Sequence, residues 1–283
     1  MEEKDIIAVT SQPVTIDSMK EDLKSLGVLP GDLVIVHSSL SSLGWVCGGP
    51  QAAIMGLLAS VQTAVAIGTL VMPAHSGEWS DPAEWRHPPV PESWIPIIRE
   101  NMPAYDPDMT PTRGMGKIPE TFRKFPGTLR SSNPQVSFTA NGPMAESILE
   151  GHPLTPMMGM ESPLGRLYTN DAKVLMLGVS YDNCTAFHLA EAMCPATPIV
   201  KMRTAMIEHG ERVWKWFEDF DYDSDDFMAI GRSLELKHPV SRGKVGNADC
   251  RLFDMKSGVD FALSWMLENR KKRTAGIQAS PHE

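Results

Sequence analysis

The sequence predicts a single large α/β unit, built around a mixed β-sheet with flanking helices and a loop elaboration rich in proline and tryptophan. Short apolar runs alternate with amphipathic helical patterns early in the chain, which is typical of β-α-β connections. The runs are too apolar to face water, so they indicate buried strands. The same succession of buried run and helix recurs near residue 175.

The first predicted elements are a helix and a β-α-β unit. The segment "TIDSMKEDLKSLGV" begins with a capping residue, Thr15 or Asp17, and is stopped by Gly27. The runs "GDLVIVHSSL" and "GTLVMPAHS" are predicted strands, and "GGPQAAIMGLLASVQ" between them is a helix with Pro50 near its first turn.

Residues 75–135 differ in amino-acid composition from the segments on either side of them. Proline at high density excludes long helices and central strands there. Trp79, Trp85 and Trp94 argue against disorder. We therefore expect an ordered, loop-rich region that lines a cleft, with one short helix in "MGKIPETFRKFPG".

The later elements complete the fold. "DAKVLMLGVS" is a further buried strand, and "TAFHLAEAMC" is the helix that follows it. After residue 210 come an alternating run, an acidic turn and a helix, and "GVDFALSWMLENRKKR" is a closing helix with a basic C-terminal end. We expect one domain over residues 1–273 and a flexible tail over residues 274–283.

Composition narrows the function classes. The 283-residue chain has a net charge of −9, which disfavours nucleic acid and anionic membranes as partners and favours a cationic ligand. The four cysteines lack zinc spacing and the chain has no HExxH motif, so no metal site is predicted. The acidic N-terminus does not resemble a signal peptide, and the longest apolar stretch is interrupted by polar residues. A cytoplasmic protein is expected.

Two predicted strands end with similar chemistry. His37 ends the run "VIVHSS", and a loop rich in serine and glycine follows. His188 and Glu191 stand three residues apart at the start of the helix after the later strand, so they share one helical face. Ligands of open α/β sheets bind where strands deliver their carboxyl ends, so these residues could converge on one crevice.

Other interpretations remain open at this point. A histidine at a strand end is often a satisfied polar residue, and the acidic run "EDFDYDSDD" is either a solvated turn or a site for a polycation. "LGVSYD" is similar to a degraded nucleophile elbow, which would make Ser180 the nucleophile of an α/β hydrolase, with Asp219 and His238 following in order. Cys184 and His188 could also form a thiolate pair.

Taken together, the ordered landmarks resemble the aminoglycoside 3-N-acetyltransferase family from about residue 15 to residue 268. They are "VHSSLSSLGWVCGG", "LVMPAHS", "DPAEWRHPPVPESW", "MPAYDPDMTPTRGMGKIPETFR", "PGTLRSSNPQVSFTANG", "ESPLGRLY", "VLMLGVSYDNCTAFHLAE" and "WFEDFDYDSDDF". The resemblance implies direct transfer of an acetyl group from acetyl-CoA, a co-substrate, to the 3-amino group of a 2-deoxystreptamine aminoglycoside or to another polyamine. The protein would be a monomer or a homodimer.

The resemblance also implies roles for particular residues. His188 would be the general base, supported by Glu191, with His37 as a further catalytic candidate. Histidine suits this role because its ordinary pKa lies near neutrality. The expected acetyl-CoA contacts are His37, Ser38, Ser39, Arg113, Gly114, Met115, Gly116, Arg130 and Ser131. The expected carboxylates for the substrate's ammonium groups are Glu78, Asp182, Glu218, Asp219 and Asp221.

Two positions depart from the family pattern. Asn133 replaces the histidine that usually precedes proline in the "RSxHP" segment, and Cys184 stands where the family often has a polar residue.

The chemistry of acetyl transfer fits these groups. An acidic site attracts a multiply charged amine, and backbone N–H groups at a strand-to-helix turn could stabilise the oxyanion of acyl transfer. A non-catalytic binder of a cationic compound stays an alternative, as does the hydrolase.

Overall fold

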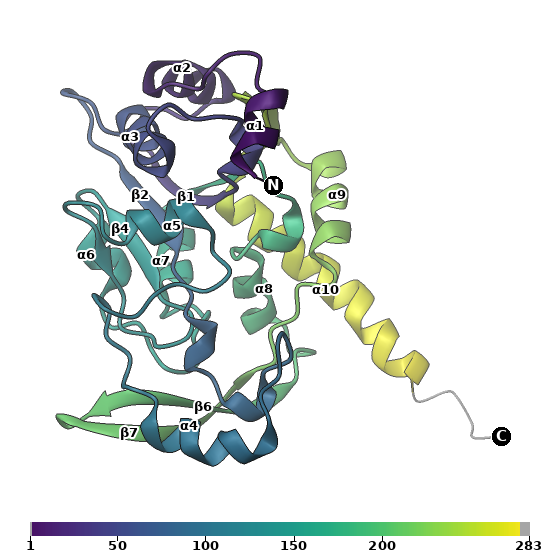
Figure 1. Cartoon of the computed structure of the whole chain (residues 1–283). Coiled ribbons are helices and arrows are strands. Elements are labelled where there is room, and N and C mark those ends of the chain that lie inside the picture. Colours follow the sequence, from purple (N-terminus) through teal and green to yellow (C-terminus); the bar gives the residue numbers. More distant parts are fainter. Residues whose placement is uncertain (1, 278–283) are drawn as a thin grey trace.

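The centre of the molecule is a seven-stranded mixed sheet (Figure 1), and the computed structural model describes residues 2–277, with side chains to residue 270. The strand order is β3-β4-β2-β1-β5-β9-β8. β2, β1 and β5 are parallel, and the strands on both sides of them are antiparallel. The strands are β1 (Leu33–Ser38), β2 (Thr69–Pro73), β3 (Leu129–Arg130), β4 (Phe138–Asn141), β5 (Lys173–Leu177), β8 (Ser241–Val245) and β9 (Ala248–Asp254).

Helices cover both sides of the sheet, which confirms the predicted fold class. The helices are α1 (Glu3–Val9), α2 (Ile16–Leu26), α3 (Gly49–Val61), α4 (Ile95–Asn101), α5 (Lys117–Phe122), α6 (Ala145–Leu149), α7 (Pro163–Thr169), α8 (Phe187–Met193), α9 (Phe227–Lys237) and α10 (Met255–Ile277). Short 3-10 turns are η1 (Ser41–Leu43), η2 (Gly77–Trp79), η3 (Pro82–Glu84), η4 (Glu92–Trp94) and η5 (Tyr181–Asn183).

Alternating side chains of the central strands divide the core into two halves. Val34 and Val36 of β1 pack with residues of α2, α3 and α5 on what we call the α3 side. Leu33 and Ile35 pack with residues of α7 to α10 on what we call the α8 side. Because both sides are covered, β1 and β2 are buried along nearly their whole length and mostly apolar, as the sequence indicated.

Local signals set the ends of the first helices where the sequence predicted. The hydroxyl of Thr15 accepts from the backbone of Ser18 and caps α2. Gly27 adopts φ 110° and ends the helix, because a left-handed residue costs little without a side chain. Pro50 lies in the first turn of α3.

The proline-rich middle is ordered and loop-rich, as predicted, and it joins a separate two-stranded hairpin. The hairpin strands are β6 (Ile199–Glu208) and β7 (Glu211–Phe220). In Figure 1 the hairpin lies below the main sheet beside α4. Asp81 pairs with Arg99 of the middle and with Arg203 of β6, so one carboxylate ties the two segments together.

The last helix extends into the segment that was expected to be a tail. α10 includes residues 274–277 of the expected tail, and residues 278–283 lie outside the described residues. Between residues 2 and 277, the helices are all too short or too polar to cross a membrane.

Candidate active site

The carboxyl ends of three neighbouring parallel strands bring histidines together. His37 lies in β1, His75 follows β2, and His188 lies in α8 after β5. Leu33, Ile35 and His37 alternate onto the α8 side. The ring of His75 contacts Phe138 of that same side, with the ring centroids 5.6 Å apart. His37, His75 and His188 therefore face one region from three segments.

His188 is oriented by a buried carboxylate. Its Nδ1 lies 2.5 Å from Oε2 of Glu191, whose side chain is fully buried. The i, i+3 spacing on α8 makes this contact possible, as the sequence predicted. Phe227 and Tyr222 contact the imidazole ring and limit its rotation. Among the described residues Nε2 of His188 makes no hydrogen bond, so it is the nitrogen available to a ligand.

Glu191 is itself held by two further partners. Its Oε1 accepts from the guanidinium of Arg270 at 2.7 Å and from the backbone N–H of Asp223 at 3.1 Å. Arg270 comes from α10 and also pairs with Asp226. These donors leave the other oxygen of Glu191, Oε2, to His188. Glu191 can therefore keep a proton on Nδ1 of His188 and offset a positive charge on the ring.

His37 and His75 are neutral at neutral pH. Burial, with the charge of His188 second, lowers the pKa of His37 to about 3. Burial, followed by the charges of His188, His37, His152 and Arg130, lowers the pKa of His75 to about 3. Nε2 of each ring is shielded from water and lacks a hydrogen-bond partner among the described residues.

A larger cavity of about 580 Å³ opens at the loop after β1. Ser38, Ser39, Gly114, Met115 and Gly116 line it, so the structure brings these predicted residues together. Its other lining residues are Glu3, Ile6, Leu40, Ser41, Gly44, Trp45, Val46, Gly49, Pro50, Lys117, Val179 and Asn183.

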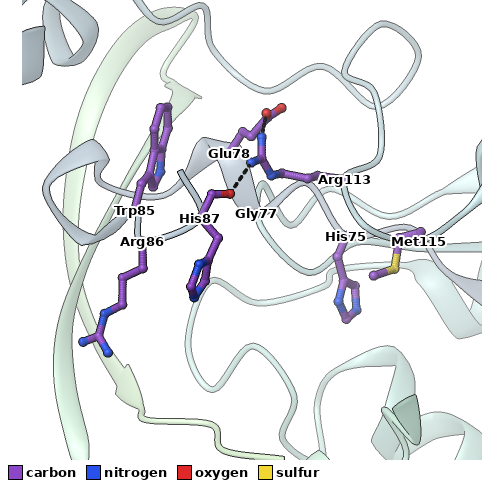
Figure 2. Close-up of a pocket in the computed structure, with 8 residues that line it drawn as sticks. All are labelled: His75, Gly77, Glu78, Trp85, Arg86, His87, Arg113 and Met115. Carbon is purple, nitrogen blue, oxygen red and sulfur yellow. Dashed lines mark hydrogen bonds and ion pairs between the residues drawn. The ribbon is translucent and has the colours of Figure 1, made fainter. Parts of the chain in front are cut away.

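A smaller cavity of about 360 Å³ lies next to the larger one, and Met115 lines both. Figure 2 shows the ion pair between Arg113 and Glu78 on one of its walls, with His75 and Met115 together on another. Arg113 also donates to the carbonyl of His87. Glu78, expected to bind the substrate, and Arg113, expected to bind acetyl-CoA, thus form an ion pair with each other in this structure.

Arg130 and Ser131 do not line either cavity. Arg130 donates to the backbone carbonyls of Pro107, Thr110 and Ala74 and to two serine hydroxyls. Ser131 is buried and bonded to His152 and to the backbone of Phe138. All five guanidinium N–H donors of Arg130 have protein acceptors. The structure therefore gives both residues the role of holding the loop region together, which differs from the expected contact with acetyl-CoA.

Asp219 also has internal partners instead of facing a cavity. Its carboxylate accepts from the backbone N–H groups of Met157 and Phe220, at 2.8 Å each, and burial raises its pKa. Glu218 and Asp221 are exposed, and Glu218 lines a separate cavity of about 450 Å³ with Trp216. The expectation that Asp219 points into the crevice is wrong for this structure, because the hairpin turns its carboxylate toward the segment around Met157.

Other acidic residues depart from expectation as well. Asp226, at the end of the acidic run, is buried and paired with Arg270, so it is not part of a solvated turn. Asp182 is exposed at η5, where it accepts a hydrogen bond from the hydroxyl of Ser180. The acidic run thus contains supporting residues as well as solvated ones.

Groups proposed for covalent chemistry are poorly placed for it. Within the described residues, Ser180, Asp219 and His238 make no hydrogen bond to one another, and His238 packs on Phe261. Burial raises the pKa of Cys184 to about 12, so its thiol stays protonated.

Asn133, which replaces the family's usual histidine, accepts from the N–H groups of Gln135 and Val136 and shapes a turn. No group of residues in the described part of the chain is arranged to hold a metal ion.

Sequence reasoning missed three residues of this region. Lys117 lines the larger cavity, His75 lines the smaller one, and Arg270 binds Glu191. His75 could have been found, since it also follows a buried strand as His37 does. Arg270 could not, because its contact with α8 depends on how a distant helix packs.

Comparisons with known proteins identify the family of the chain. The sequence pattern of the aminoglycoside 3-N-acetyltransferase family matches residues 35–267. The chain is 47% identical over 270 residues to the SPbeta prophage-derived aminoglycoside N(3')-acetyltransferase-like protein YokD of Bacillus subtilis, covering 95% of this chain and 98% of that protein. It is 34% identical to aminoglycoside N(3)-acetyltransferase IX of Micromonospora chalcea, covering 96% of this chain and all of that protein.

Solved structures are similar over nearly the whole chain. The crystal structure of YokD superposes with a TM-score of 0.92 at 46% identity, covering 95% of this chain and 99% of that one. AAC-VIa bound to sisomicin gives a TM-score of 0.81 at 29% identity, covering 91% and 99%. AAC-IIIb with CoASH gives 0.79 at 30% identity, covering 91% and 97%. The chain belongs to the aminoglycoside 3-N-acetyltransferase family and is an N-acetyltransferase.

Proposed function

We propose that the protein transfers an acetyl group from acetyl-CoA directly to the 3-amino group of a 2-deoxystreptamine aminoglycoside, with His188 as general base. The observation that carries the proposal is the His188–Glu191 pair, which leaves Nε2 of a well-oriented imidazole open where three strand ends meet. The similarity to enzymes crystallised with CoASH and with sisomicin supports the choice of the two substrates.

The larger cavity suits the anionic co-substrate. A side chain added at Gly49, Gly114 or Gly116 would meet no protein atom, so the backbone there borders open space. The exposed Lys117 and the uncommitted hydroxyl of Ser38 line or border that space. Backbone amides and a lysine are common partners of phosphate and amide oxygens. Acetyl-CoA would supply the acetyl group as an activated thioester.

The smaller cavity suits the amine substrate. Glu78 is the carboxylate among its lining residues, and it is already paired with a cation, Arg113. An ammonium group of the substrate would replace that guanidinium at the same carboxylate. Because Met115 lines both cavities, the two substrates would meet beside His75 and Met115.

His188 would remove a proton as the amine attacks. Nδ1–H donates to Glu191, so the lone pair of Nε2 is free to accept the proton. The buried carboxylate of Glu191 then offsets the charge of the imidazolium. The proton can return to the departing thiolate, which yields the amide and free CoA thiol without net change in the enzyme.

A thiol-release assay with acetyl-CoA and a panel of amines tests this function. The panel should contain 2-deoxystreptamine drugs, drugs without that ring, and linear polyamines. We expect thiol release only with the first group, and an acetylated 3-amino group by mass spectrometry and NMR. Ester cleavage that needs no CoA and disappears in Ser180→Ala would instead indicate a hydrolase, and tight drug binding without thiol release would indicate a non-catalytic binder.

A further inference from the structure

Six buried side-chain polar atoms have no hydrogen-bond partner among the described residues, and half of them belong to the strand ends of the candidate site. They are Nε2 of His37, the hydroxyl of Ser38 and Nε2 of His75. An unsatisfied buried polar atom destabilises the fold, so such atoms are rare in native proteins. Their concentration at one edge of the sheet indicates that a ligand is their partner.

Several backbone N–H groups at this edge bind protein carbonyls. The N–H of Ser39 donates to the carbonyl of Leu177, and the N–H of Gly178 donates to the carbonyl of Asp249. The N–H groups of Asn183, Cys184 and His188 also bind nearby carbonyls. These five N–H groups are therefore bound by protein, whereas those of Val179 and Ser180 have no hydrogen-bond partner within the described residues and stay possible donors to the oxyanion. His37, Ser38 and His75 add side-chain groups at the same edge.

His75 is held where such a donor is needed. The backbone N–H of Ser76 donates to the carbonyl of Gln135, so the strand direction continues past β2. The carbonyl of His75 accepts from the N–H of Arg113 at 2.9 Å, which fixes His75 to the loop that carries Met115. The ring lies on the α8 side, as His37 does, and lines the cavity next to Met115.

We propose that His75 is a catalytic residue that donates a hydrogen bond from its neutral imidazole to the acyl oxygen of the thioester, with His37 as a second donor. This role rests on the proposed acetyl transfer. As the amine nitrogen bonds to the acyl carbon, the electron pair of the C=O bond moves onto oxygen. When the pair returns, the carbon–sulfur bond breaks and the sulfur leaves as thiolate.

Neutrality suits both histidines to this role. A protonated imidazole would repel the polycationic substrate and the imidazolium that forms at His188. A neutral imidazole N–H can stabilise an oxyanion without transferring a proton to it, as the neutral histidine of triosephosphate isomerase does. The burial that lowers the pKa of His37 and His75 to about 3 keeps both rings in this form.

The kinetic test compares His75→Ala, His75→Gln and His75→Asn with a control, His209→Asn. His209 is exposed at the hairpin turn, with φ 52°, and asparagine tolerates that backbone. Removal of one oxyanion donor lowers kcat by about 10²–10³. We expect this loss in His75→Ala, with KM for both substrates within about twofold of wild type, which is well under 1 kcal/mol. Glutamine places an amide near the position of Nε2, whereas asparagine reaches only that of Nδ1, so Gln should restore more activity than Asn.

A binding experiment tests the same contact without turnover. The probes are CoA and the ketone analogue of acetyl-CoA in which a methylene replaces the sulfur, so only the second carries an acyl oxygen. We expect the imidazole resonances of His75 to shift in ¹⁵N NMR with the ketone and not with CoA. Equal shifts with both probes, or none with either, would overturn the proposal.

The outcomes also separate this inference from the proposed function. Unchanged kcat in a folded His75→Ala variant overturns the role of His75 alone, and a rise confined to the amine KM would make His75 a substrate-binding residue instead. If no amine is acetylated by wild type, the proposed function fails. Slow hydrolysis of acetyl-CoA by water, which also releases the thiol, can then be compared in wild type and His75→Ala. A slower rate in the variant would still show that His75 acts on the acyl oxygen.

Discussion

The edge formed by β1, β2 and β5 differs in the structure from two charged residues elsewhere, Arg130 of β3 and Asp219 of β7, although all of these residues are polar in sequence. At the strand edge, His37, Ser38 and His75 each keep an atom without a hydrogen-bond partner in the part of the chain that the structure describes. By contrast, the donors of Arg130 bind backbone carbonyls and serine hydroxyls, and the oxygens of Asp219 accept from backbone N–H groups. A polar residue is available to a ligand only where the fold has left it uncommitted. The residue type alone does not distinguish the two cases.

Among the residues of the strand edge, loss of His188 should lower the rate of acetyl transfer most. We expect His188→Ala to lower kcat by about 10²–10⁴, the usual contribution of a positioned general base. Binding of acetyl-CoA, measured by calorimetry, should be nearly unchanged, because the larger cavity does not include His188. His209→Asn is the matched control. Turnover equal to wild type at neutral pH would remove His188 from the mechanism.

Substitutions of Lys117 and Arg130 should show most clearly the difference between a cation available to a ligand and a cation bound by protein. Lys117 lines the larger cavity and has no ion pair within the described residues, so Lys117→Ala should raise the KM for acetyl-CoA by about tenfold. Arg130→Lys should leave that KM unchanged, since the donors of Arg130 face protein acceptors. It should lower the free energy of unfolding by about 1–3 kcal/mol, because lysine cannot reproduce the guanidinium fork. The opposite pattern in kinetics and urea unfolding would reverse the assignment of the two cations.

A matched pair of acidic residues gives a smaller effect. Asp219→Asn should lower the free energy of unfolding by about 1–3 kcal/mol, because an amide cannot accept from both Met157 and Phe220 as the carboxylate does. The drug KM should stay near that of wild type. Asp221→Asn, at an exposed position, should leave stability unchanged and affect the drug KM only at low salt. A large, salt-resistant rise in drug KM for Asp219→Asn would return Asp219 to the binding site.

Acid should weaken the fold gradually. The pKa values of His37 and His75 are lowered to about 3 and that of His152 to about 4, from an ordinary value of 6.5. Below pH 6.5 the unfolded chain therefore binds protons that the folded chain does not, so stability falls as the pH drops toward these lowered values. The loss is about 1 kcal/mol per pH unit for each histidine. Urea unfolding between neutral pH and pH 5 should show this slope, and His37→Asn should make it shallower. A flat profile in both proteins would mean that these rings are protonated in the fold.

Much of the architecture is readable from local patterns. The buried runs of β1, β2 and β5, the cap at Thr15 and the stop at Gly27 depend on neighbours in the chain, so they were predicted. β3, β4, β6, β8 and β9 were not identified, because their pairing is set by distant segments. The alternating run at β7 predicted a strand, but its partner β6 precedes it across a turn at His209 and Gly210.

The sequence by itself determined which residues stand at the strand ends and that His188 and Glu191 share a helix face, since both follow from chain connectivity and helical period. It also determined the family, through many short landmarks in order. Only the tertiary structure decided that Arg270 of α10 holds Glu191, that Asp219 and Arg130 bind protein, and that His75 keeps an atom uncommitted. Hydrogen-bond partners of long polar side chains come from segments far away in the chain, and burial sets the strength and charge of each group. Both depend on packing, which no local pattern specifies.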